Sequence, residues 1–331
     1  PFSELEGMAE HEGIRKLAAD LQNASNLEIM SDATVFGVYE DNLVAAQWGT
    51  DLMKIRADRV ILATGASDRH LVFDNNDRPG IMTSRGVERL IMIHGISPAN
   101  EAVVVTSHDG GYHTALLLHG AGVKLKAVVD SRSSGTQGPF EEQIKNLDVP
   151  VYRNMTAHRA HGRKKLQRVD IGPVLGGEAT QSFDCDLLVT AVGLMPRLSL
   201  LSMGRSRPEW DPERQILRIF DLPENMYAVG EVEGSADISR LLQEGMQTGI
   251  AASKGNVQPK FERKPEEMIE ALPADIESGG DHHFICKCMD VTRKEACVSI
   301  DEGFDQVESL KRYTSMGMGP CQGKSCHEAV A

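Results

Sequence analysis

Five of the six cysteines lie near the C-terminal end of the sequence, and four of these have chemically informative spacing. They form the pattern C-x-C-x32-C-x4-C, made by Cys286, Cys288, Cys321 and Cys326. Clustered thiolates are costly unless they bind something, and four sulfurs suit a tetrahedral zinc ion or an iron–sulfur cluster. Structural zinc sites generally use C-x2-4-C pairs, whereas the first pair here is C-x-C. The spacing therefore favours a [2Fe–2S] cluster, with zinc, disulfides and free thiols as alternatives.

The residues around the second cysteine pair support this interpretation. The glycine-rich segment 317–324 lets backbone N–H groups approach cluster sulfurs, where hydrogen bonds tune the redox potential. His282, His283 and His327 border the cysteines, but four cysteines already complete a ligand set, so we expect these histidines to be solvated or capping residues. Cys297 falls within the helix expected after Thr292, and we expect it to pack there rather than to bind metal.

Two strands that end in glycine indicate a dinucleotide site. The apolar run 59–63 is typical of a buried parallel strand and is followed by Thr64 and Gly65. A second run, 226–229, is followed by Gly230 and Glu231, and a carboxylate there suits the hydroxyls of a ribose or flavin side chain. The alternative for Glu231 is an exposed loop acid.

A helix is expected over residues 238–253, directly after this second strand. Gly245 lies inside it and costs helical propensity, which predicts either close packing or contact with a cofactor ring. We therefore add Gly245 to the candidate cofactor-binding residues.

Residues 101–130 read as a second βαβ unit. A strand, a helix and a second strand ending in Asp130 follow each other at the spacing of a dinucleotide fold. The first turn, 106–111, lacks the GxGxxG pattern, and Asp109 would stand where a pyrophosphate binds. The pattern supports a dinucleotide-binding fold more strongly than it supports a bound dinucleotide. We interpret His108 as a surface or turn residue.

The remaining pattern predicts ordinary α/β elements. Helical periodicity covers residues 10–24, and β-like runs at 27–30, 33–39, 43–48 and 52–56 indicate a meander. Residues 74–77 resemble the start of a calcium loop, but no glutamate follows at the required position, so a solvated turn is expected.

Composition limits the classes of protein. The chain has 331 residues, 41% hydrophobic content and a formal net charge of −13, which argues against nucleic-acid binding and an anionic membrane surface. No apolar run approaches the ~20 residues of a membrane span. The chain begins at Pro1 without a signal sequence, so we expect a cytoplasmic protein, present here as a fragment.

Four segments carry a resemblance to a known family, and the similarity extends over nearly the whole chain. The sequence resembles the α subunit of heterotetrameric sarcosine oxidase and its relatives, the opine oxidases, dye-linked proline dehydrogenases and hydrogen cyanide synthase. The C-terminal window separately resembles the bacterioferritin-associated-ferredoxin-like [2Fe–2S] domain. The matching segments are residues 60–66, 75–82, 310–314 and 317–324.

The resemblance implies an α/β flavoprotein with two Rossmann-like dinucleotide-binding domains, the first interrupted by the second. The first would comprise residues 1–95 and 206–255, and the second, degenerate domain residues 96–205. A linker over 256–280 would lead to a small helical [2Fe–2S] domain over 281–331. The family's opening GxGxxG unit would precede Pro1, and a folate-binding domain could follow Ala331. Because the cluster cysteines are kept here, the resemblance leans toward the opine and amino-acid dehydrogenases.

By the same resemblance, the chain is an electron-transferring subunit of an amine oxidoreductase. A flavin on a partner β subunit would oxidise the C–N bond of sarcosine, proline or an opine. This subunit would bind FAD or NAD and pass electrons through the [2Fe–2S] cluster. No residue of the sequence stands out as an acid, base or nucleophile, so we name no catalytic group. The alternative is a non-catalytic scaffold, bearing zinc or a cluster, that docks a catalytic partner subunit.

Overall fold

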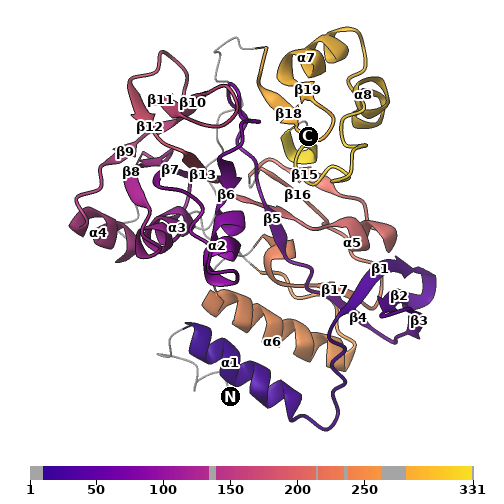
Figure 1. Ribbon diagram of the computed structural model, residues 1–331. Helices are drawn as coiled ribbons and strands as arrows, with labels where there is room; N and C mark the ends of the chain where they lie inside the picture. The colour runs from indigo at the N-terminus through magenta and orange to yellow at the C-terminus, as the bar shows by residue number, and fades with distance from the viewer. Residues whose placement is uncertain (1–9, 134–138, 214, 235–237, 262–280, 330–331) are drawn as a thin grey trace. The chain divides into compact units, whose positions relative to one another are not determined.

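The computed structural model shows a mixed α/β chain (Figure 1). The chain divides into two compact units. Unit 1 contains residues 1–66, 196–209 and 218–267, and unit 2 contains residues 67–195, 210–217 and 268–331. The expected domain boundaries remain predictions, and most of the expected linker lies outside the described residues. The structure describes residues 10–133, 139–213, 215–234, 238–261 and 281–329.

Unit 1 combines an antiparallel meander with a short parallel strand pair. The meander β1–β2–β3 forms where alternating runs are separated by polar turns, as predicted, although residues 27–30 form no strand. Strands β4 and β17 pair in parallel although 163 residues separate them in sequence. The elements are α1 (Glu10–Gln22), β1 (Ala33–Tyr39), η2 (Glu40–Asn42), β2 (Leu43–Trp48), β3 (Asp51–Arg56), β4 (Val60–Leu62), α5 (Ser199–Met203), β17 (Met226–Ala228), η3 (Gly230–Glu233) and α6 (Ile238–Lys254).

Unit 2 is built on a five-stranded parallel sheet of order β6-β13-β7-β8-β9. Its central strands are apolar on both faces because both faces are covered. The elements are β6 (Ile81–Thr83), α2 (Ser84–Met92), β7 (Glu101–Thr106), α3 (Asp109–Gly120), β8 (Lys124–Asp130), α4 (Pro139–Asn146), β9 (Val151–Arg153), β10 (Met155–His161), β11 (Arg168–Pro173), β12 (Gln181–Asp184) and β13 (Leu187–Ala191).

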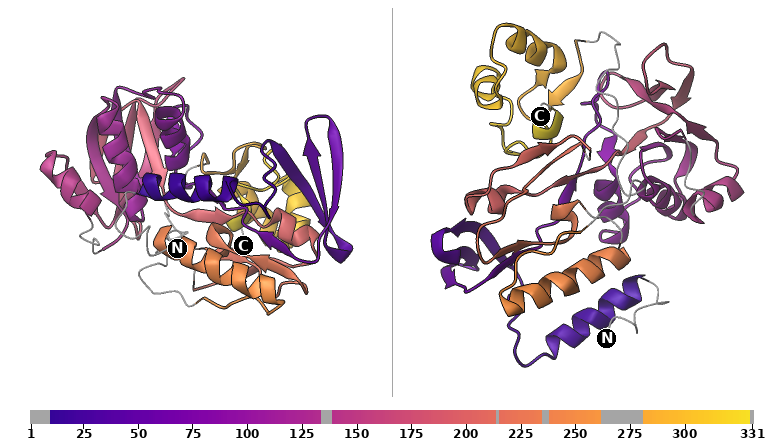
Figure 2. Two further views of the ribbon diagram at one scale, coloured as in Figure 1. Left: turned by 90° about the horizontal axis from the view of Figure 1, so that it is seen from below. Right: turned by 180° about the vertical axis from the view of Figure 1, so that it is seen from behind.

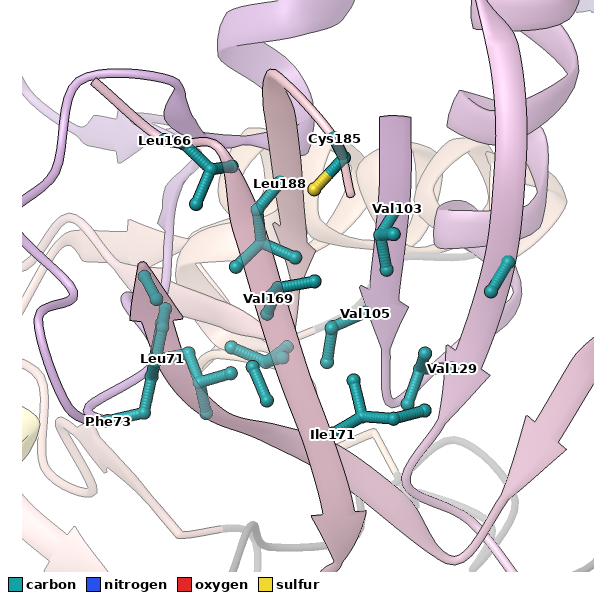
Figure 3. Packing of buried hydrophobic residues seen from close by; sticks show 14 residues of the cluster. Leu71, Phe73, Val103, Val105, Val129, Leu166, Val169, Ile171, Cys185 and Leu188 are labelled. Atoms are coloured by element: carbon teal, nitrogen blue, oxygen red, sulfur yellow. The ribbon is translucent and has the colours of Figure 1, made fainter. Parts of the chain in front are cut away.

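Two buried clusters hold the layers of unit 2 together. Val104 and Val128 face side chains of α2, α3 and α4, including Tyr112 and Leu118. On the other face of the five-stranded sheet, Val103, Val105 and Val129 pack against side chains of the antiparallel sheet β10–β11–β12 (Figure 3). The same layers are seen from two further sides in Figure 2. Four short strands each include a point at which the chain passes from one unit to the other. They are β5 (Ala66–Asp68), β14 (Leu194–Pro196), β15 (Glu209–Asp211) and β16 (Ile216–Arg218).

The end of unit 2 is a small module, residues 281–329, which we call the C-terminal module. The predicted capping box is present, because Thr292 and Glu295 exchange side-chain and backbone hydrogen bonds at the start of α7. Cys297 is exposed on α7, so the prediction that it packs there was wrong. The elements are β18 (Phe284–Cys286), β19 (Val291–Thr292), α7 (Arg293–Asp301), α8 (Val307–Thr314) and η5 (His327–Ala329).

Residues 74–77 are not the solvated turn that the sequence suggested. Asp74 and Asn76 are buried, at 5% and 1% exposure. The Asn76 side chain donates to the carbonyls of Leu71 and Phe284 at 3.0 and 2.9 Å, and it accepts the Phe284 N–H at 3.0 Å. The turn is buried because it attaches the C-terminal module to the rest of unit 2. Among the described residues, no helix is long and apolar enough to cross a membrane.

Candidate functional site: a dinucleotide edge and a four-cysteine centre

The predicted dinucleotide residues of unit 1 meet at one edge of the β4–β17 pair. Both strands end there because they run parallel, in the register Val60↔Met226 to Leu62↔Ala228. Glu231 lies in η3, just after β17, and its Oε2 accepts the backbone N–H of Ala66 at 3.3 Å. The structure therefore joins the segment after β4 to the segment after β17 through this carboxylate.

Gly65 and Gly230 both require glycine at this edge. Their φ angles are +70° and +89°, in the left-handed region that favours glycine. A Cβ on Gly65 would lie 3.4 Å from the Glu231 carboxylate. The Thr64 hydroxyl donates to the Arg197 carbonyl at 3.0 Å, which fixes the same turn. The edge is a bend of partly buried backbone with a carboxylate beside it.

Gly245 lies in α6, which packs near η3 and β17. Apart from its chain neighbours and the backbone of its own helix, no described protein atom lies within 4 Å of the position that a Cβ on Gly245 would occupy. Close protein packing therefore does not explain this glycine, and the predicted contact with a cofactor stays a prediction.

The C-terminal module gathers the four predicted cysteines. Cys288 Sγ lies 3.8 Å from Cys286 Sγ and 3.5 Å from Cys321 Sγ, and Cys326 interacts with the Cys286 thiol. Metal–sulfur bonds of ~2.3 Å in a tetrahedron place sulfurs about 3.8 Å apart, so these spacings suit thiolates that share a metal. Cys286 and Cys326 are fully buried, whereas Cys288 and Cys321 are partly exposed.

The backbone at Gly319 makes room for one of these sulfurs. A Cβ on Gly319 would come within 2.5 Å of Cys288 Sγ and 2.9 Å of Met289 Cγ. The loop before Cys321 therefore approaches the first cysteine pair closely only because this residue is glycine. The predicted role of the glycine-rich segment, which is to hydrogen-bond cluster sulfurs through backbone N–H groups, stays a prediction.

Burial affects the thiols of the second pair differently. Burial, together with the neighbouring Cys286 thiol, raises the pKa of Cys326 to about 12. At Cys321 burial also acts to raise the pKa, but hydrogen bonds with Ser325 and Cys288 outweigh it and bring the pKa below the ordinary value. Cys321 is thus the thiol of this pair that ionises more readily.

The alternatives for the cysteine centre can be compared with the geometry. All six cysteines are free, and the sulfur separations of 3.8 and 3.5 Å exceed a disulfide bond length of ~2.05 Å. The His282 ring is tilted against the Phe284 ring, with the ring centroids 6.5 Å apart, and His327 packs against Gly317 and Gly323. Within the described ranges, no three His, Cys, Asp or Glu side chains are arranged to hold a metal ion as they stand. The sulfurs meet in successive pairs, and the assignment as ligands remains a prediction.

The sequence-based prediction was wrong for one residue that contacts this module. Asn76 was placed in a solvated turn, yet it holds the backbone of Phe284, two residues before Cys286. Its partner lies 208 residues away, so no local pattern identifies it. The resemblance over residues 75–82 was the available signal, because it included this position.

Comparisons with known proteins agree with the resemblance. The family described as pyridine nucleotide-disulphide oxidoreductase matches residues 2–255, and the sarcosine oxidase A3 domain matches residues 280–331. The alpha subunit of sarcosine oxidase from Corynebacterium sp. (strain P-1) is 27% identical over 93% of this chain and 35% of that protein. An opine oxidase subunit from Agrobacterium tumefaciens (strain Ach5) is 20% identical over 92% of this chain and 71% of that protein.

A solved structure shares the fold. The crystal structure of L-proline dehydrogenase from P. horikoshii has a TM-score of 0.69 and 20% identity, covering 96% of this chain and 62% of that one. The chain spans about a third of the length of the sarcosine oxidase subunits that it matches. The predicted α/β class with Rossmann-like folds is confirmed. Because the first family match extends over most of the sequence, the chain belongs to the pyridine nucleotide-disulphide oxidoreductase family.

Proposed function

We propose that the chain is an electron-transferring subunit of an amine or amino-acid oxidoreductase. It would bind FAD or NAD in unit 1 and a [2Fe–2S] cluster in the C-terminal module. The partner would be a flavin-bearing β subunit that oxidises a C–N bond of a small substrate such as sarcosine, proline or an opine. Support comes from similarity to sarcosine oxidase and opine oxidase subunits and from the four-cysteine geometry.

The proposal depends mainly on one observation, which is that the thiols of Cys286, Cys288, Cys321 and Cys326 lie close together in successive pairs. Cys286 and Cys288 come from the β18 side of the module, and Cys321 and Cys326 come from the loop after α8, yet their sulfurs meet. Packing alone does not require the four thiols to meet in successive pairs, and the space at Gly319 admits the sulfur of Cys288. The four residues supply the donor set of a sulfur-ligated cluster, which would provide one-electron transfer when bound.

The unit 1 edge fits a dinucleotide by its backbone and charge. Gly65 and Gly230 leave backbone open to a ligand, and Glu231 offers acceptor oxygens to hydroxyl donors. A flavin or nicotinamide dinucleotide would supply two-electron exchange. We assign no acid, base or nucleophile to this chain, and place the oxidation of the amine on the partner subunit.

Anaerobic reconstitution tests the cluster. The chain is incubated with ferrous iron and sulfide, desalted and measured for iron, sulfide, zinc and visible absorption. The proposal expects about two irons and two sulfides per chain, with thiolate-to-iron absorption bands. Cys321→Ser should lose most of the bound iron, whereas the matched control Cys297→Ser, at an exposed position on α7, should keep it.

The same measurement decides against the scaffold alternative. A colourless protein with one zinc per chain and no bound iron would contradict the electron-transfer role and favour a zinc-stabilised scaffold. Equal iron loss in Cys297→Ser and Cys321→Ser would contradict the ligand assignment.

A further inference from the structure

In the turn after β7 of unit 2, backbone N–H groups are already hydrogen-bonded to other groups of the chain. In a dinucleotide-binding domain this turn leads into a helix whose first N–H groups bind the pyrophosphate. Here His108 is the N-cap of α3, and its Nδ1 accepts the Gly110 N–H at 3.1 Å. The Gly111 N–H donates to the His108 carbonyl at 3.2 Å. Two donors that a phosphate would use are therefore already occupied.

Asp130, at the end of β8, is also fully engaged. In such a fold the acid at this position accepts hydrogen bonds from ribose hydroxyls. Asp130 is completely buried, and its Oδ1 accepts from the backbone N–H and Nε of Arg132, each at 3.0 Å. Its Oδ2 accepts from Tyr112 Oη and from Arg132 Nη2, each at 2.8 Å. Both carboxylate oxygens are satisfied without a ligand.

Arg132 links this acid to the turn. Its Nη2 lies 2.8 Å from Asp130 Oδ2 and 3.0 Å from Asp109 Oδ1, and its side chain is only 11% exposed. Asp109 is the residue that the sequence placed at the pyrophosphate position. One guanidinium therefore bridges the position of the phosphate and the position of the ribose.

We propose that Arg132 takes the place of a ligand in the second dinucleotide-type domain, so that this domain does not bind a nicotinamide dinucleotide. The guanidinium neutralises Asp109 and Asp130, and a dinucleotide would have to displace it while meeting the charge of Asp109. Separating a buried, hydrogen-bonded ion pair is strongly unfavourable because it leaves a charge uncompensated. The domain keeps the dinucleotide-type fold, but the Arg132 guanidinium occupies the position between Asp109 and Asp130 where a dinucleotide would bind. This inference concerns unit 2 alone and does not depend on the cysteine centre.

Titrations of the full chain with NADH and NADPH test this assignment, using nucleotide fluorescence and calorimetry. Asp130→Asn should leave the nucleotide affinity of the chain within twofold of the unsubstituted value, because Asp130 is not a ligand contact. The double variant Asp109→Gly/Arg132→Ala should acquire an additional site, with a gain in affinity of at least tenfold over background. A matched control, Asp148→Gly/Arg163→Ala, changes the same charges at exposed positions of unit 2 and should gain nothing.

Two results would overturn the assignment. A tenfold or greater loss of NADH or NADPH affinity in Asp130→Asn would show that Asp130 contacts the nucleotide. A folded double variant, checked by circular dichroism, that gains no site would show that Arg132 is not what closes the domain. If the double variant does not fold, the Asp130→Asn result decides.

Discussion

The side-chain amide of Asn76 pairs with the backbone of Phe284 as a neighbouring strand would. Asn76 Nδ2 donates to the Phe284 carbonyl at 2.9 Å, and the Phe284 N–H donates back to Asn76 Oδ1 at 3.0 Å. Asn76 is 1% exposed, so water cannot replace these bonds easily. Because Phe284 lies in β18 with Cys286, this pair connects the position of the first cysteines to the sheet-bearing part of unit 2.

Replacing Asn76 should loosen the C-terminal module. Asn76→Ala removes both bonds and leaves the Phe284 N–H and carbonyl without their partner, which we expect to lower the free energy of unfolding by about 2–3 kcal/mol. Hydrogen exchange at the Phe284 amide should also become faster in Asn76→Ala than in the unsubstituted chain. The exposed neighbour Asp77→Ala is the control and should change stability by less than about 0.5 kcal/mol. Equal protection of the Phe284 amide in both variants would contradict the role of Asn76.

A methyl group at Gly319 should disturb the cysteine centre. The added Cβ would meet Cys288 Sγ at 2.5 Å and Met289 Cγ at 2.9 Å, so the sulfur or the loop must shift. We expect Gly319→Ala to reduce the iron bound after anaerobic reconstitution by at least half. Gly249→Ala, in α6, should keep full iron content, because no described atom outside the helix's own backbone and the chain neighbours lies within 4 Å of the new Cβ. Normal loading of Gly319→Ala would show that the loop does not limit the site.

The effect of the Glu231 charge can be tested separately from the effect of its hydrogen bond with the Ala66 N–H. In Glu231→Gln the amide oxygen can still accept the Ala66 N–H, so thermal stability should stay within about 2 °C. The loss of the carboxylate should weaken FAD or NAD binding about tenfold, because a charged acceptor forms stronger hydrogen bonds to hydroxyls. Calorimetric titration checks this, with Glu224→Gln at an exposed position before β17 as control. Unchanged affinity in Glu231→Gln would remove Glu231 from the dinucleotide site.

Acid should weaken unit 2 through His108. Burial, assisted by the nearby charge of Arg132, lowers the pKa of His108 to about 4, from 6.5 in the unfolded chain. Between pH 6.5 and 4 the unfolded state therefore binds a proton that the folded state does not, and stability falls as pH falls. Below pH 7, the unfolding free energy should drop by up to about 1.4 kcal/mol per pH unit from this group.

A helix N-cap residue that does not titrate between pH 7 and 4.5 provides the comparison for His108. His108→Asn keeps a side-chain acceptor for the Gly110 N–H, so chemical denaturation from pH 7 to 4.5 should show a loss about 1–3 kcal/mol smaller than in the unsubstituted chain. Parallel pH profiles for the two proteins would mean that His108 does not carry this dependence.

Local patterns were sufficient for much of the fold. Apolar runs predicted β7, β8 and β13, because strands covered on both faces carry few polar residues. The capping box at Thr292 and Glu295 was also predictable, since both partners lie within one helical turn. The glycines after β4 and β17 indicated where two strands end at one edge, and the structure places Gly65 and Gly230 there.

Other features depended on contacts that no local pattern contains. Asn76 is buried because Phe284, far along the sequence, covers it. Cys297 was assigned to the wrong side of α7, because the orientation of a short helix is set by the packing of its neighbours. Asp109 was recognised as unsuited to a pyrophosphate, but its neutralisation by Arg132 follows from a turn conformation that brings residues 109 and 132 together.

The most direct test of the proposed electron transfer is electron paramagnetic resonance of the reconstituted chain after reduction by dithionite. A [2Fe–2S] centre carries one electron, so the account predicts a signal that integrates to about one spin per chain. Cys321→Ser should abolish or strongly reduce this signal, and Cys297→Ser should keep it. A reduced sample without a signal, containing zinc in place of iron, would contradict the central claim.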